Sequence, residues 1–116
     1  MATEAEEQVK HAYEAFSTAM RFVEEADIAA ARTAIDSAVM HLTRAANVED
    51  CAWCKRRIDG LILAAARVRE TGVPDVRALR VATEELVEMM PLAEKFLSKY
   101  EGGVLEKITG NVEHVD

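Results

Sequence analysis

The two cysteines of the chain, Cys51 and Cys54, are three residues apart and flank its single tryptophan, Trp53. A thiol pair at this spacing, on a turn or at the start of a helix, can supply two of the four ligands that zinc takes in a tetrahedron. Free cysteine is also a common small apolar residue of protein interiors. The sequence therefore leaves a zinc site and an ordinary core position open.

His41 is the candidate third ligand, because it lies about six residues from the end of the helix that precedes the cysteines. Cys54 lies about one turn into the next helix, so the two residues sit at similar depths if the helices run in opposite directions. We predict a metal site of Cys51, Cys54 and His41, with zinc as the expected ion. Water, an acid such as Glu7, or a second subunit would complete it.

Thiol redox chemistry is the second interpretation of the cysteine pair. Cys51 begins a predicted helix and is followed by the basic run 55–57, and both features stabilise a thiolate. The segment 51–54 resembles the redox pair of thioredoxin-like proteins. That pair follows a strand in a βαβ unit, whereas no strand is predicted here, so the resemblance is confined to these four residues.

Two further resemblances concern phosphate chemistry. The segment 41–45 is similar to the site of histidine phosphotransfer domains, in which a Lys three residues after the histidine is followed by Gly. Arg44 and Ala45 stand at those two positions. The resemblance would imply a solvent-facing, phosphorylated His41.

The acidic pairs Glu4/Glu7 and Glu24/Asp27 match the E-x-x-E and E-x-x-D strings with which all-α pyrophosphatases of the MazG kind bind magnesium. On one helix these pairs would be roughly 30 Å apart, too far for a single ion. Glu85 and Glu88 offer another carboxylate pair. An all-α, metal-dependent enzyme of this type, with its site shared between subunits, is the alternative function.

Apolar residues recur at helical spacing along most of the 116 residues, and the chain has only two prolines and five glycines. Thr3, Asp27 and Asp50 are the expected N-caps, and Asn47 is expected to end the second helix in a left-handed conformation. The predicted helices are about 4–25, 28–46, 51–71 and 76–100.

Short links between these helices predict an all-α, up-down antiparallel four-helix bundle. Pro91 lacks a backbone donor, so we expect the last helix to be kinked or broken there. The bundle is predicted to span residues 1–103. Residues 104–116 are predicted to form a short amphipathic piece and a flexible tail.

The net charge of −7 argues against a nucleic-acid partner, which requires a basic surface. No apolar run approaches the ~18 residues of a membrane span, so no membrane partner is expected. The acidic first ten residues do not resemble a signal peptide, and we expect a cytoplasmic protein.

Several large apolar residues remain after one buried stripe is assigned to each helix, and they predict a surface for self-association or for a protein partner. The sequence thus favours a small non-enzymatic binding or structural module that forms a homodimer, with a cysteine-based metal or thiol site at one pole. The candidate interaction residues are Trp53, Leu63, Met89, Leu92 and Phe96.

Overall fold

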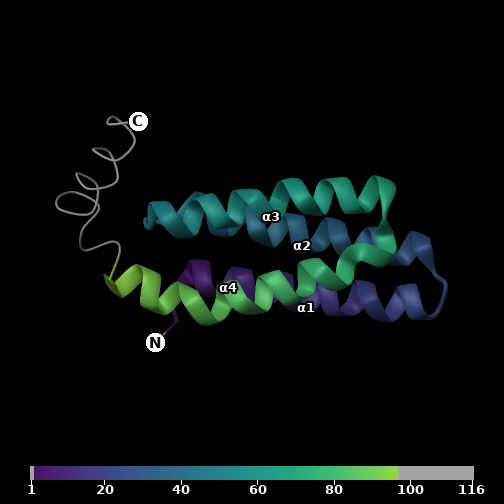
Figure 1. Cartoon of the computed structure of the whole chain (residues 1–116), viewed down its shortest axis with the longest axis horizontal. Helices are drawn as coiled ribbons and strands as arrows, with labels where there is room; N and C mark the ends of the chain where they lie inside the picture. The colour runs from purple at the N-terminus through teal and green to yellow at the C-terminus, as the bar shows by residue number, and fades with distance from the viewer. Residues whose placement is uncertain (1, 97–116) are drawn as a thin grey trace, which may run out of the picture.

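The computed structural model describes residues 2–96, and all regular structure in that range is helical. The four long helices are α1 (Glu4–Glu24), α2 (Ile28–Val48), α3 (Ala52–Thr71) and α4 (Val76–Phe96), and the short 3-10 turn η1 (Val73–Asp75) precedes α4 (Figure 1). The prediction of an all-α domain of four packed helices is confirmed. The predicted end of the last helix near residue 100 and the segment 104–116 lie outside the described residues.

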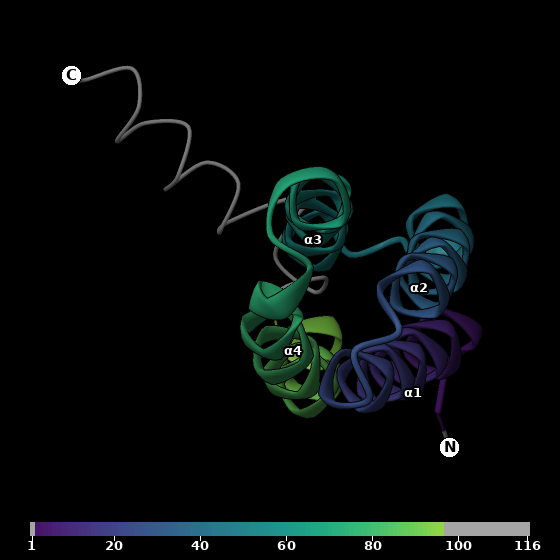
Figure 2. The ribbon, with the colours of Figure 1, turned by 90° about the vertical axis from the view of Figure 1, so that its right-hand side faces the viewer.

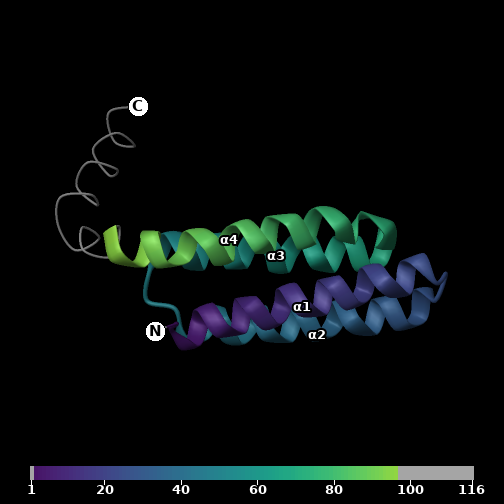
Figure 3. The same ribbon diagram turned by 90° about the horizontal axis from the view of Figure 1, so that it is seen from below.

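The helices pack side by side around a shared interior. The α1–α2 and α3–α4 links lie at one end of the molecule, and the α2–α3 link lies at the other (Figures 1 and 3). Seen end-on, α1 lies beside α2 and α4, and α3 also lies beside α2 and α4 (Figure 2). The α2–α3 link therefore shares its end of the molecule with the start of α1 and the last turns of α4.

Alanine dominates the interior, which lets the helix backbones approach closely, and larger apolar side chains fill the remaining space. The largest completely buried apolar side chains are Phe16, Ile35, Leu42, Ile58 and Met90. No helix of the described part is both long enough and apolar enough to span a membrane.

Two arginines form side-chain hydrogen bonds between neighbouring helices. Arg80 of α4 donates to the hydroxyls of Ser17 (2.9 Å) and Tyr13 (3.1 Å) of α1. Arg69 of α3 contacts the Asp36 carboxylate of α2 through two nitrogens, one of them at 3.0 Å. These contacts fix the register of the α1–α4 and α2–α3 pairs.

The first two helices begin at the expected N-caps. The Thr3 hydroxyl accepts the Glu6 amide at 3.1 Å, and the Glu6 carboxylate accepts the Thr3 amide at 3.4 Å, which forms a capping box. The Asp27 carboxylate accepts the Ala30 amide at 3.1 Å. Each side chain satisfies an amide that the helix itself leaves unpaired.

The ends that flank the α2–α3 link differ from the prediction. Helix α2 continues through Asn47 to Val48, and no left-handed residue ends it. The N-cap of α3 is Cys51 itself and not Asp50, because the Cys51 sulfur accepts the Cys54 amide at 3.3 Å. The link is therefore only three residues long, and its middle residue makes no cap.

Helix α4 runs through Pro91 to Phe96 as one element, so the predicted break is wrong for the described residues. Pro91 is exposed, and water can bond the carbonyl that loses its amide partner. Met90 and Ala93 on either side are buried and hold the helix against the core. A kink at this point stays a prediction.

The α1–α2 turn gives a stability prediction. Ala26 is exposed and has φ of 61°, a left-handed conformation that penalises a side chain. We expect Ala26→Gly to raise the free energy of unfolding by about 0.5–1 kcal/mol in chemical denaturation. The matched control Ala66→Gly, at an exposed site within α3, should lower it by about 1 kcal/mol. Destabilisation by both substitutions would contradict the turn geometry.

Candidate metal centre

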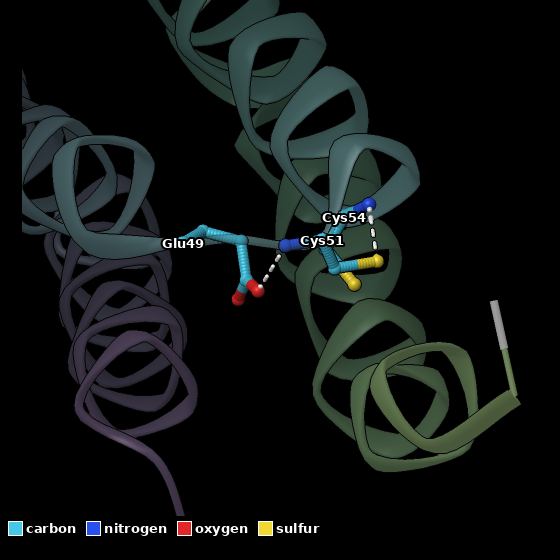
Figure 4. Close-up of side chains that lie close together, drawn as sticks. All are labelled: Glu49, Cys51 and Cys54. Atoms are coloured by element: carbon cyan, nitrogen blue, oxygen red, sulfur yellow. Dashed lines mark hydrogen bonds between the residues drawn. The ribbon is translucent and has the colours of Figure 1, made fainter. Parts of the chain in front are cut away.

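The cysteine pair lies at the junction of the α2–α3 link with α3, and both side chains are completely buried. The Cys51 sulfur is held by the Cys54 amide, and the Glu49 carboxylate accepts the Cys51 amide at 3.0 Å (Figure 4). Local backbone contacts therefore hold the Cys51 sulfur and the Glu49 carboxylate in place. The carboxylate and both sulfurs extend from the same side of the chain (Figure 4).

One oxygen of Glu49 and the sulfurs of Cys51 and Cys54 all lie within 4.8 Å of one another. Within residues 2–96 this is the single group of three or more such donors that could share an ion. The donor atoms around a zinc ion with 2.3 Å bonds are about 3.8 Å apart. Small side-chain rotations thus suffice to bring these three donors onto one ion.

Glu94 brings a second carboxylate to this pole from α4. It lines a cavity of about 290 Å³ together with Glu49 and Cys51. Burial, followed by hydrogen bonding with Glu6 and Glu49, raises the pKa of Glu94 to about 9. At neutral pH the Glu94 side chain is therefore a neutral carboxylic acid. A metal ion that bound this carboxyl group would displace its proton.

Two carboxyl oxygens at the pole, Oε2 of Glu49 and Oε1 of Glu94, are buried and accept no hydrogen bond from an amide, hydroxyl or basic group of residues 2–96, so the partners of the Glu94 carboxyl group are the carboxyl groups of Glu6 and Glu49. A buried acceptor without a partner costs about 1–3 kcal/mol. None of the ion pairs formed among residues 2–96 includes either side chain. The pole thus gathers acidic and thiol groups, and no basic side chain of residues 2–96 forms an ion pair with Glu49 or Glu94.

The thiol of Cys54 is held in its protonated form. Burial raises its pKa, and the nearby Cys51, Glu49 and Glu94 side chains raise it further. A buried, protonated thiol is a poor nucleophile, because the thiolate is the reactive species. This environment counts against thiol redox chemistry, whereas a metal ion would displace the proton and remove the electrostatic penalty.

His41 of α2 points toward α1 and contacts two of its residues, Gln8 and His11. Its Nδ1 is 2.7 Å from the Gln8 amide oxygen, and its ring centre is 5.2 Å from that of His11. Burial, then His11 and Arg44, lowers the pKa of His41. The structure thus joins His41 to Gln8 and His11, and the cysteines to Glu49. Coordination by His41 stays a prediction without a contact to support it.

Residues expected to carry other chemistry are distributed over the surface. Glu85 and Glu88 are exposed on α4, and no third ligand joins them within the described part of the chain. Glu4 and Glu7 are exposed on α1. His41 is half-buried, unlike the solvent-facing histidine of a phosphotransfer site.

The expected interaction residues lie on α3 and α4. Leu63, Met89, Leu92 and Phe96 are exposed, and Trp53 is half-buried. Trp53 and Leu63 belong to α3 and the other three to α4, and these two helices lie side by side (Figure 2).

No protein-family model, curated protein or solved structure matches this chain.

The raised pKa of Glu94 predicts how the metal-free protein responds to pH. The pKa of Glu94 is about 9 in the folded protein and 4.5 ordinarily. Below a pH of about 4.5 Glu94 is protonated in the folded and the unfolded chain, so it does not affect stability. As the pH rises from there toward about 9 the free energy of unfolding falls, because only the unfolded chain releases the proton. Glu94→Gln keeps the neutral shape, so we expect this variant to be more stable than the parent at pH 9 and similar to it at pH 4.5. Urea denaturation with a chelator present measures both values.

Glu88→Gln is the matched control, since Glu88 is exposed on the same helix. It should follow the parent at every pH. Stability curves for Glu94→Gln and the parent that run parallel from pH 4.5 to 9 would contradict a buried, neutral Glu94.

Proposed function

We propose that this chain is a small metal-binding helical module in which Glu49, Cys51 and Cys54 hold a zinc ion. The observation that carries the proposal is the group of two buried thiols and one half-buried carboxylate whose donor atoms lie within 4.8 Å of one another. Buried polar atoms in native proteins almost always have partners. A cation supplies the partner that the Glu49 oxygen lacks.

Glu94 is the proposed fourth ligand. Its buried Oε1 accepts no hydrogen bond from an amide, hydroxyl or basic group of residues 2–96, and the side chain lines the same cavity as Glu49 and Cys51. Two sulfurs and two carboxylate oxygens give the four donors of a tetrahedral zinc site. The thiols favour zinc over magnesium or calcium, which prefer oxygen alone.

The proposed site is structural and not catalytic. Catalytic zinc keeps an open position for water or substrate, whereas this donor set fills all four positions in a buried pole. The ion would join the α2–α3 link to the last turns of α4, two parts of the chain that are distant in sequence. The positive end of the α3 helix dipole, at Cys51, offsets part of the remaining negative charge.

The short links at alternate ends support an up-down antiparallel order for the bundle (Figure 1). Reduced, metal-binding thiols are typical of the cytoplasm, which supports that location. An enzymatic role has less support, because the proposed ion has no free coordination position.

Metal analysis tests the proposed ligands. We expect untagged protein to bind one zinc per chain, and Cys51→Ser or Cys54→Ser to abolish binding. Glu49→Gln and Glu94→Gln should each weaken zinc affinity by roughly 10–100-fold in competition with a chromophoric chelator, because each removes a charged ligand. Elemental analysis and the chelator titration give the two readouts.

Two controls make this test specific. Glu88→Gln removes an exposed carboxylate from α4 and should leave the affinity unchanged. His41→Ala should also leave it unchanged if the carboxylates complete the site, and a loss in this variant would restore histidine as a ligand. Wild-type affinity in both Glu49→Gln and Glu94→Gln would contradict the proposed site.

A further inference from the structure

An apolar groove runs along the outer face of the α3–α4 pair. It consists of three adjoining hollows, and neighbouring hollows share residues: Ala82 and Glu85 join the first to the second, and Trp53 and Met89 join the second to the third. The middle hollow has a volume of about 560 Å³. We call this continuous feature the α3–α4 groove.

The groove carries much of the large apolar surface that the described residues expose. Among the residues that line it, the exposed fractions are 47% for Val81, 49% for Met89 and 60% for Leu92. Phe96 of α4 and Leu63 of α3 are exposed on the same two helices but do not line the three hollows. A contiguous apolar surface of this kind marks a contact with another protein surface.

The spacing on α4 is that of helix–helix packing. Ala82, Glu85, Met89, Leu92 and Phe96 follow one another at alternating steps of three and four residues, as the core positions of packed helices do. Glu85 is the charged exception in the middle of this stripe. A helix that packs here must therefore bring a positive charge to the level of Glu85.

The opposite bank of the groove has that charge. Arg56 and Arg57 of α3 line the same middle hollow as Glu85 of α4. Neither arginine forms an ion pair with a residue of the described range 2–96. The Arg57 guanidinium lies over the Trp53 ring at 5.0 Å. The groove thus has positive side chains on α3 and a negative side chain, Glu85, on α4 at the same level along the helices.

A surface with both charges side by side is complementary to itself. A two-fold axis along the groove sets α3 of one chain over α4 of its partner at the same level, which brings Arg56 and Arg57 onto Glu85 of the partner subunit. A two-fold axis across the groove would instead stack α3 on α3 and α4 on α4, with like charges opposed. Electrostatic complementarity selects the first arrangement.

We propose that the α3–α4 groove binds a second copy of this chain, with the two-fold axis parallel to the helices. Helices α3 and α4 of each subunit then form a four-helix interface, in which Met89 and Leu92 pack against the partner's α3. Gly60 lies in the middle hollow, and a Cβ atom added there would meet nothing within 4 Å. Its small size permits the partner's α4 to approach closely.

Sedimentation and light scattering on the full chain test the proposal, with zinc present and with a chelator. We expect twice the single-chain mass of 12.8 kDa at concentrations of about 10–100 µM. The double variant Arg56→Glu/Arg57→Glu and the single variant Glu85→Lys should each associate at least about tenfold more weakly. Equimolar mixing of the two should restore a dimer, because each new charge then meets its opposite.

Gly60→Gln provides a steric test, because it fills the groove at a position where the folded chain has free space. We expect a folded monomer, whereas Ala66→Gln, exposed on α3 outside the groove, should leave the dimer intact. Circular dichroism confirms that each variant is folded.

Two results would overturn the proposal. A wild-type chain that stays at 12.8 kDa over the whole concentration range would leave the groove to a different protein or to another part of this chain. A dimer that none of the variants weakens, or folded charge variants that fail to associate on mixing, would place the contact on another surface. None of the groove substitutions changes a proposed zinc ligand. Either result would therefore overturn the dimer proposal without contradicting the proposed metal site.

Discussion

A buried carboxylate needs a countercharge or a full set of hydrogen bonds, and within the described chain the pole at the α2–α3 link offers Glu94 only the carboxyl groups of Glu6 and Glu49 as partners. Glu49 and Glu94 each bury an oxygen that accepts no hydrogen bond from an amide, hydroxyl or basic group of residues 2–96, next to two buried sulfurs. In the absence of a cation Glu94 and Cys54 keep their protons, because burial and the neighbouring side chains raise the pKa values of both groups. The same features that make this pole costly to the metal-free protein are those that the proposed zinc ion would relieve.

The rest of the fold brings these groups together. Alanine-rich faces let the helices pack closely, and the capping box at Thr3 and the cap at Asp27 fix where α1 and α2 begin. The Arg80 contacts set the register of α4 against α1 and thereby carry Glu94 to the level of the link. A metal at this pole would join the chain's midpoint to the end of α4, which no covalent link does. A domain of this size buries only a modest core, so a bound metal ion would contribute a large share of its free energy of unfolding.

Helical periodicity was sufficient to predict the four helices, two of their N-caps and the burial of both cysteines, because each of these depends on local sequence. The ligand set was not predictable. Glu49 and Glu94 are two of 21 acidic residues, and only tertiary packing distinguishes them from the exposed ones. Asp50 is the expected cap of α3 because aspartate is a preferred N-cap residue, whereas Cys51 makes the cap in the structure. Depth along the helices alone predicts His41 beside the cysteines, whereas its angular position on α2 directs it to Gln8.

The surplus of apolar residues on α3 and α4 is visible in the sequence. The opposed charges of Arg56 and Glu85 are not, because they depend on how the two helices are aligned.

The central claim concerns which atoms surround the ion, so X-ray absorption at the zinc edge of the zinc-loaded full chain tests it most directly. The account predicts two sulfur neighbours at about 2.3 Å and two oxygen neighbours at about 2.0–2.2 Å. A shell of only nitrogen and oxygen would contradict it, and so would imidazole scattering in place of the carboxylate oxygens.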